Sequence, residues 1–184
     1  TINKPLTIIG PGYFLGQNIK TLANILPARI GSVCFMPGSE GTTLTGVSVL
    51  GSVYINENNI VISRSYVNGM LYLARDRSIA NCIIRQSYII NGIENSGANA
   101  AANISIKNNV VKYVQLNNTS SAIIHNNVLQ HKVIDGNFHS IDVYYSDIRN
   151  NIIYTTGRIL MRNENITTNN LHARSGNDDQ YGNK

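Results

Sequence analysis

The densest group of titratable side chains in the chain is "DGNFHSIDVYYSD", residues 135–147. Asp135, Asp142 and Asp147 lie close together in this stretch, with His139 among them. Two carboxylates about 5 to 9.5 Å apart can act as acid and base on a glycosidic bond. These four residues are therefore candidates for catalysis on a carbohydrate. Ordinary solvated carboxylates in a long surface loop would give the same pattern.

A second set of side chains recurs along the chain. Each of these residues directly follows an isoleucine, at intervals near twenty residues; the set is Arg85, Lys107, His125 and Arg149. If the chain brings them into line, they form a row that can contact anionic glycans or phosphates. We therefore name them as candidate ligand-binding residues. The alternative is that outward positions are simply polar, with charges that discourage edge-to-edge aggregation.

Both the catalytic candidates and the ligand-binding candidates lie in or beside a sequence repeat, which must place them in the fold. "SIKNNVVKYV" at 105–114 is followed by "AIIHNNVLQH" at 122–131 and "DIRNNIIYTT" at 147–156. The apolar residue that opens each repeat can be called its anchor, and successive anchors are 18 to 24 residues apart. The anchors are Leu44, Ile62, Ile84, Ile106, Ile124 and Ile148, with Thr167 in the last position. A period near twenty with variable spacing predicts a solenoid whose loops vary while its strands stay aligned.

The local pattern predicts strands for these repeats. Around each anchor, apolar and polar residues alternate with period two, and β-branched residues dominate. A second short strand is expected between most anchors, at 52–55, 70–73, 113–116, 141–145 and 158–161. Strand alternation then points the anchors inward and the residue after each anchor outward. The predicted fold is all-β, a parallel β-helix with coils of about 18–24 residues.

The Asn-Asn pairs have a structural role in such a stack. Asparagine tolerates the left-handed backbone of a sharp bend, and its amide can bind the equivalent amide one coil away. Asn108, Asn126 and Asn150 are expected to form one column, with Asn109, Asn127 and Asn151 beside it. We therefore interpret the repeat mainly as a structural feature of the fold.

The "IxNNxI"-type repeats resemble the right-handed parallel β-helix proteins of the pectate-lyase-like superfamily. The segments "INKPLTIIGPGYFLGQN" and "GTTLTGVSVLGSVYI" resemble secreted or cell-surface members from Gram-negative bacteria. The resemblance implies a single-stranded right-handed β-helix over residues 1–175, irregular over 1–43 and regular over 44–175. Residues 176–184 are expected to form a polar tail that continues into a further segment. The superfamily includes lyases, hydrolases and noncatalytic surface proteins, so the fold does not decide the activity.

The composition of the chain argues against several classes of partner and ligand. The net charge is +5, but only 14% of the residues are charged and no Lys/Arg blocks occur, which argues against nucleic acid. No apolar run approaches the length of a transmembrane helix. The acidic residues share no strand position in three successive coils, so no calcium site, other metal site or cofactor is expected. Cys34 and Cys82 are expected to be buried free thiols.

Tyrosine offers another surface for sugar or protein contact, because the chain has ten tyrosines and no tryptophan. Those on or beside the second strand of a coil are Tyr54, Tyr72, Tyr113, Tyr144 and Tyr145. Two classes of function follow. The first is a noncatalytic secreted or cell-surface module that contacts a surface polysaccharide or another surface or outer-membrane protein. The alternative is a carbohydrate-active enzyme, a polysaccharide lyase or a glycoside hydrolase, with its site around residues 135–149.

Overall fold

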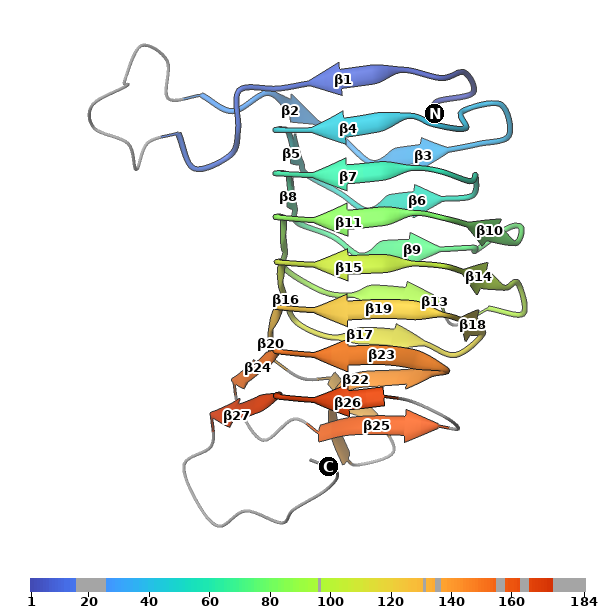
Figure 1. Cartoon of the computed structure of the whole chain (residues 1–184). Coiled ribbons are helices and arrows are strands. Elements are labelled where there is room, and N and C mark those ends of the chain that lie inside the picture. Colours follow the sequence, from blue (N-terminus) through green and yellow to red (C-terminus); the bar gives the residue numbers. More distant parts are fainter. Residues whose placement is uncertain are drawn as a thin grey trace.

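The chain winds into a parallel β-solenoid of about six turns, as Figure 1 shows. The computed structural model describes residues 1–15, 26–95, 97–130, 132–134, 137–154, 158–162 and 166–173. Each regular coil contributes one short strand to each of three long sheets, and each strand pairs with its equivalents in the coils before and after. The all-β solenoid predicted from the repeats is confirmed.

The anchors lie on the first of these sheets, the anchor sheet. Its strands are β1 (Thr7–Ile9), β4 (Thr43–Thr45), β7 (Val61–Ser63), β11 (Ile83–Arg85), β15 (Ser105–Lys107), β19 (Ala122–His125), β23 (Ser146–Arg149) and β26 (Ile166–Thr168). The next strand of each coil lies in the corner sheet: β2 (Arg29–Ile30), β5 (Ser48–Val49), β8 (Tyr66–Val67), β12 (Tyr88–Ile89), β16 (Val110–Val111), β20 (Val128–Leu129), β24 (Ile152–Tyr154) and β27 (Leu171–Ala173).

The remaining strands form the third sheet and a small three-stranded sheet. The third sheet contains β3 (Val33–Phe35), β6 (Val53–Ile55), β9 (Leu71–Leu73), β13 (Ile93–Asn95), β17 (Val114–Leu116), β22 (Asn137–Tyr144) and β25 (Arg158–Arg162). These strands are parallel, whereas β21 (Lys132–Ile134) pairs with β22 in the antiparallel sense. The small sheet contains β10 (Ile79–Ala80), β14 (Ala101–Ala102) and β18 (Thr119–Ser120). The predicted second strands thus correspond to strands of the third sheet, whereas the corner strands were not predicted.

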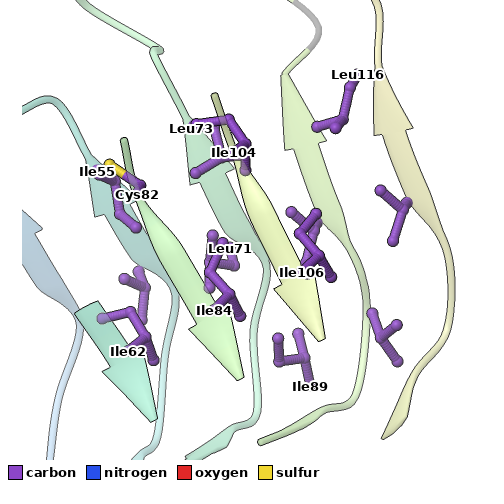
Figure 2. Close-up of a cluster of buried hydrophobic side chains, with 14 of the residues drawn as sticks. Ile55, Ile62, Leu71, Leu73, Cys82, Ile84, Ile89, Ile104, Ile106 and Leu116 are labelled. Atoms are coloured by element: carbon purple, nitrogen blue, oxygen red, sulfur yellow. The ribbon is translucent and has the colours of Figure 1, made fainter. Parts of the chain in front are cut away.

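The anchors form one inward stack. The register pairs Ile62 with Ile84, Ile84 with Ile106, and Ile106 with Ile124, and Ile148 continues the column. All five side chains are fully buried. Figure 2 shows Ile62, Ile84 and Ile106 in a row inside the solenoid. Full burial of such a side chain contributes about 1.5–3 kcal/mol, so the predicted column is a main source of stability.

The two residues of each Asn-Asn pair divide the two expected roles between them. Asn108, Asn126 and Asn150 have φ near +55° (57°, 57° and 54°) and make the bend after the anchor strand. The following residue in each pair is buried, and its side chain joins a hydrogen-bonded ladder. The ladder residues are Asn109, Asn127, Asn151 and Asn170, and serine replaces asparagine at Ser65 and Ser87 in the earlier coils.

Candidate functional site

The four predicted ligand-binding residues lie in line on the outer face of the anchor sheet. Arg85 pairs with Lys107, Lys107 with His125, and His125 with Arg149 in successive parallel strands. Each follows a buried anchor, so strand alternation points it outward. Neighbouring members are about 4.8 Å apart along the solenoid axis. The predicted alignment is confirmed, and we call these four residues the basic row.

One carboxylate neutralises part of the basic row. The Nε of Arg149 donates a hydrogen bond to Oδ1 of Asp147 over 2.5 Å. The Nε2 of His125 lies 3.2 Å from Oδ2 of the same carboxylate, close enough for electrostatic attraction but without hydrogen-bond geometry. Within the described part of the chain, Arg85 and Lys107 make no ion pair or side-chain hydrogen bond. The positive charge of the row is therefore concentrated at Arg85 and Lys107.

A groove of about 430 Å³ runs beside the row on the same sheet. Its floor includes the outward residues that precede the anchors, whereas the basic row follows the anchors. The lining residues are Asn103, Ile104, Ser105, Ser121, Ala122, Ile123, Tyr145, Ser146, Asp147 and Ile166. These lining residues thus combine apolar side chains with hydroxyls, an amide and a carboxylate. Such a mixture suits a sugar, which has apolar ring faces and polar edges.

Tyr145 has an unusual backbone at the rim of this groove. Its φ is 44°, and the equivalent residues of the two preceding coils are Ser121 and Asn103, with φ of 60° and 53°. A bulky residue in the left-handed region is strained, at a cost on the order of 1–3 kcal/mol. The side chain is 49% exposed, so a structural need to bury the ring does not explain the tyrosine. Strained residues of this kind concentrate at binding sites.

Of the carboxylates predicted as catalytic candidates, the two that the structure describes lie on different sheets. Asp142 lies on β22 in the third sheet, and Asp147 lies on β23 in the anchor sheet. Asp142 is only 1% exposed, whereas Asp147 lines the groove. Asp135 lies outside the described residues, and for His139 the description is limited to its backbone in β22. Proximity in sequence therefore does not bring Asp142 and Asp147 to a shared face.

The third sheet contains an acidic column that the sequence patterns did not reveal. Glu94, Gln115 and Asp142 occupy equivalent outward positions in three successive strands. The hydroxyl of Tyr113 donates to Oε1 of Glu94 over 2.6 Å, and Nε2 of Gln115 lies 3.5 Å from Oδ2 of Asp142. Burial raises the pKa of Tyr113, and the hydrogen bond to Glu94 and its charge raise that pKa further. All four side chains are buried, so the column joins coils and offers little surface to a substrate.

Two of the predicted tyrosines already make a cation–π contact with an arginine of the same chain. Tyr54 and Tyr72 stack in register on the third sheet, with ring centroids 5.2 Å apart and an interplanar angle of 14°. The guanidinium carbon of Arg75 lies 5.3 Å and 5.5 Å from the two centroids. Cation–π contact of this kind stabilises the loop that carries Arg75. Among the predicted tyrosines, Tyr145 is the one that lines the groove.

The described residues give no sign of a metal or redox centre. In that part of the chain, no three His, Cys, Asp or Glu side chains gather where they could hold a metal ion. Cys82 is buried, and burial raises the pKa of its thiol to about 11, which makes it unreactive at neutral pH. Cys34 is partly exposed, so full burial was wrongly expected for it. The described ranges include no helix long and apolar enough to cross a membrane.

The fold and its surface together define the class of protein. It is a parallel β-solenoid whose anchor sheet carries the basic row and a groove with both apolar and polar lining residues. Comparison of the chain with protein-family models, with curated proteins and with solved structures finds no match.

Proposed function

We propose that the chain is a noncatalytic binding module for an acidic polysaccharide, which lies along the outer face of the anchor sheet. The observation that carries the proposal is the groove at Tyr145 lying directly beside the aligned basic row. Acidic polysaccharides are found chiefly outside cells, so the proposal goes with a secreted or cell-surface location. Membership of the pectate-lyase-like superfamily, in its Gram-negative surface branch, is part of the same proposal.

The chemistry of the face suits such a ligand. A polysaccharide aligned with the solenoid axis meets one coil after another, at steps of about 4.8 Å. Tyr145 and Ile123 offer apolar surface to a sugar ring, while Ser105 and Asp147 can bind its hydroxyl groups. Lys107 and Arg85, which have no partner among the described side chains, are free to pair with carboxylate or sulfate groups.

The position of the carboxylates supports binding over hydrolysis. Among the described residues, Asp147 is the carboxylate that lines the groove, and Arg149 already binds it. A glycoside hydrolase uses two carboxyl groups that flank the bond to be broken. Asp142, the other described candidate, lies on a different sheet and is buried. Asp147 and Asp142 therefore do not form such a pair.

Removal of the free cations tests the proposal. The double variant Arg85→Ser/Lys107→Ser is compared with Lys4→Ser/Arg29→Ser, which removes two exposed cations from the N-terminal coils. Isothermal titration with polygalacturonate at low and physiological salt measures affinity, with dextran as the neutral control. The first variant should bind roughly tenfold more weakly, because each exposed charge contact is worth up to about 1 kcal/mol. The control variant should bind like the wild type.

The same assay has clear contrary outcomes. Equal affinity of Arg85→Ser/Lys107→Ser and wild type at low salt would exclude the basic row. Equal affinity for dextran and polygalacturonate would exclude an acidic ligand. A calcium-dependent rise in the absorbance of unsaturated products would favour the lyase alternative over a noncatalytic module.

A further inference from the structure

The corner sheet carries an exposed apolar column in its later coils. Val110, Val128, Ile152 and Leu171 occupy equivalent positions in β16, β20, β24 and β27. Their exposed fractions are 44%, 37%, 42% and 61%. We call these four residues the apolar stripe. Contiguous apolar surface of this kind on a soluble protein usually marks an interaction site.

The same column is covered in the earlier coils. Tyr66 and Tyr88 occupy its positions in β8 and β12, and Tyr88 is paired with Val110. The ring of Tyr13 lies 6.2 Å from that of Tyr66, and the ring of Phe14 lies 6.1 Å from that of Tyr88. The chain therefore packs aromatic residues from its N-terminal segment over the first part of the column. The stripe continues this surface without comparable cover from the described residues.

Cations lie on both sides of the stripe at Val110. Lys107 lies three residues before Val110, across the bend at Asn108, and the exposed Lys112 lies two residues after Val110. Further along the first border, His125 and Arg149 of the basic row lie beside the carboxylate of Asp147, so within the described ranges Lys107 is the cation of the row that stays unpaired next to the stripe. Tyr154, which is 63% exposed, lies two residues after Ile152. The surface thus combines an aliphatic centre, flanking cations and a phenol at the edge.

We propose that the apolar stripe docks on an anionic membrane surface. The aliphatic side chains would enter the boundary between headgroups and acyl chains, where apolar burial drives binding. Lys107 and Lys112 would contact lipid phosphates, and Tyr154 would lie at the headgroup level, as amphipathic aromatic rings do. This role goes beyond glycan binding, because it uses the corner sheet in place of the groove, and only Lys107 of the basic row is common to both surfaces.

The composition of the stripe favours a lipid surface over a protein partner. A protein interface carries roughly one hydrogen bond per 100–200 Å² of buried area, and its core is rich in aromatic residues, Met and Arg. The four stripe residues have aliphatic side chains without donors or acceptors. A second copy related by a two-fold axis parallel to the stripe would place its Lys112 against Lys107. An anionic lipid surface satisfies both the apolar centre and its basic borders.

Vesicle sedimentation tests the docking. The protein is mixed with vesicles of phosphatidylcholine, or of phosphatidylcholine with phosphatidylglycerol, at low and physiological salt. The double variant Val128→Thr/Ile152→Thr keeps β-branched residues at exposed positions, so the strands should form. Its matched control is Ile9→Thr/Leu50→Thr, which changes two exposed apolar residues of the N-terminal coils. A second variant, Lys112→Ser, tests the basic border, and thermal melting checks the fold of every variant.

The wild type should prefer vesicles with phosphatidylglycerol, and added salt should weaken its binding. Val128→Thr/Ile152→Thr should bind these vesicles about tenfold more weakly while its affinity for polygalacturonate stays unchanged. Lys112→Ser should reduce the salt dependence, and the control variant should bind like the wild type. Equal binding of the stripe variant and wild type, or no preference for phosphatidylglycerol, would overturn the proposal. A concentration-dependent dimer that the stripe variant abolishes would show that a second copy covers the stripe instead.

Discussion

The asparagine ladder gives the sharpest stability prediction, at Asn127. Its side chain is fully buried and makes four hydrogen bonds to the two neighbouring coils. The Oδ1 accepts from the backbone N–H and the Nδ2 of Asn109, at 2.9 Å and 3.1 Å. The Nδ2 donates to Oδ1 of Asn151 and to the carbonyl of Ile106, both at 3.0 Å. One side chain thus joins three coils.

Replacement of Asn127 by alanine should lower the free energy of unfolding by a large amount for a single substitution. Asn127→Ala removes all four bonds, each worth about 1 kcal/mol net, for a loss of about 4 kcal/mol. The buried N–H of Asn109 also loses its acceptor, and an unsatisfied donor alone costs about 1–3 kcal/mol. Asn127→Ser is the matched comparison, because Ser87 occupies the equivalent position and its Oγ accepts from the backbone N–H of Ser65 at 3.2 Å. The serine variant should therefore lose only about half as much.

Urea unfolding followed by circular dichroism measures both effects, with the slope m checked for each variant because solenoids can unfold in parts. Asn126→Gly serves as a nearby control, since Asn126 has a φ of 57° that glycine adopts freely. A free-energy loss below about 1 kcal/mol for Asn127→Ala would refute the reasoning that the ladder bonds are net stabilising. If the alanine and serine variants lost equal free energies of unfolding, the side-chain oxygen at position 127 would not be an important acceptor for the backbone N–H of Asn109.

Two further predictions concern the core and the third sheet. Ile106→Asp should cost several kcal/mol, because it buries an unpaired charge in the anchor stack, and an unchanged melting temperature would contradict the stack. The raised pKa of Tyr113 means that the folded state keeps a proton that the unfolded chain releases near pH 10. Stability should therefore fall as pH rises above about 10, and Tyr113→Phe should make that fall smaller in urea titrations at increasing pH. An identical fall in wild type and variant would exclude Tyr113 as its source.

The solenoid and the basic row could be predicted from the sequence because both depend on one register. A period-two strand fixes which residues face inward, and a one-residue slip would expose every anchor. Ile106 and Ile124 therefore determine where Lys107 and His125 point. The apolar stripe was missed although Val110, Val128 and Ile152 belong to the quoted repeats. Its strands contain only two or three residues, too few for alternation to show which member of "VV" or "VL" faces outward.

The sequence by itself determined the repeat, the inward anchors and the line of the basic row, because these follow from a local period multiplied along the chain. Tertiary structure decided which sheet and column each carboxylate occupies. Asp142 and Asp147 are five residues apart yet lie on different sheets, whereas Glu94 and Asp142 share one column. In a solenoid, residues one coil apart are about 4.8 Å apart, and neighbours within a coil turn to different faces. The length of each loop sets which residues share a column. Only the folded coils show where in the coil the extra residues of a longer loop lie.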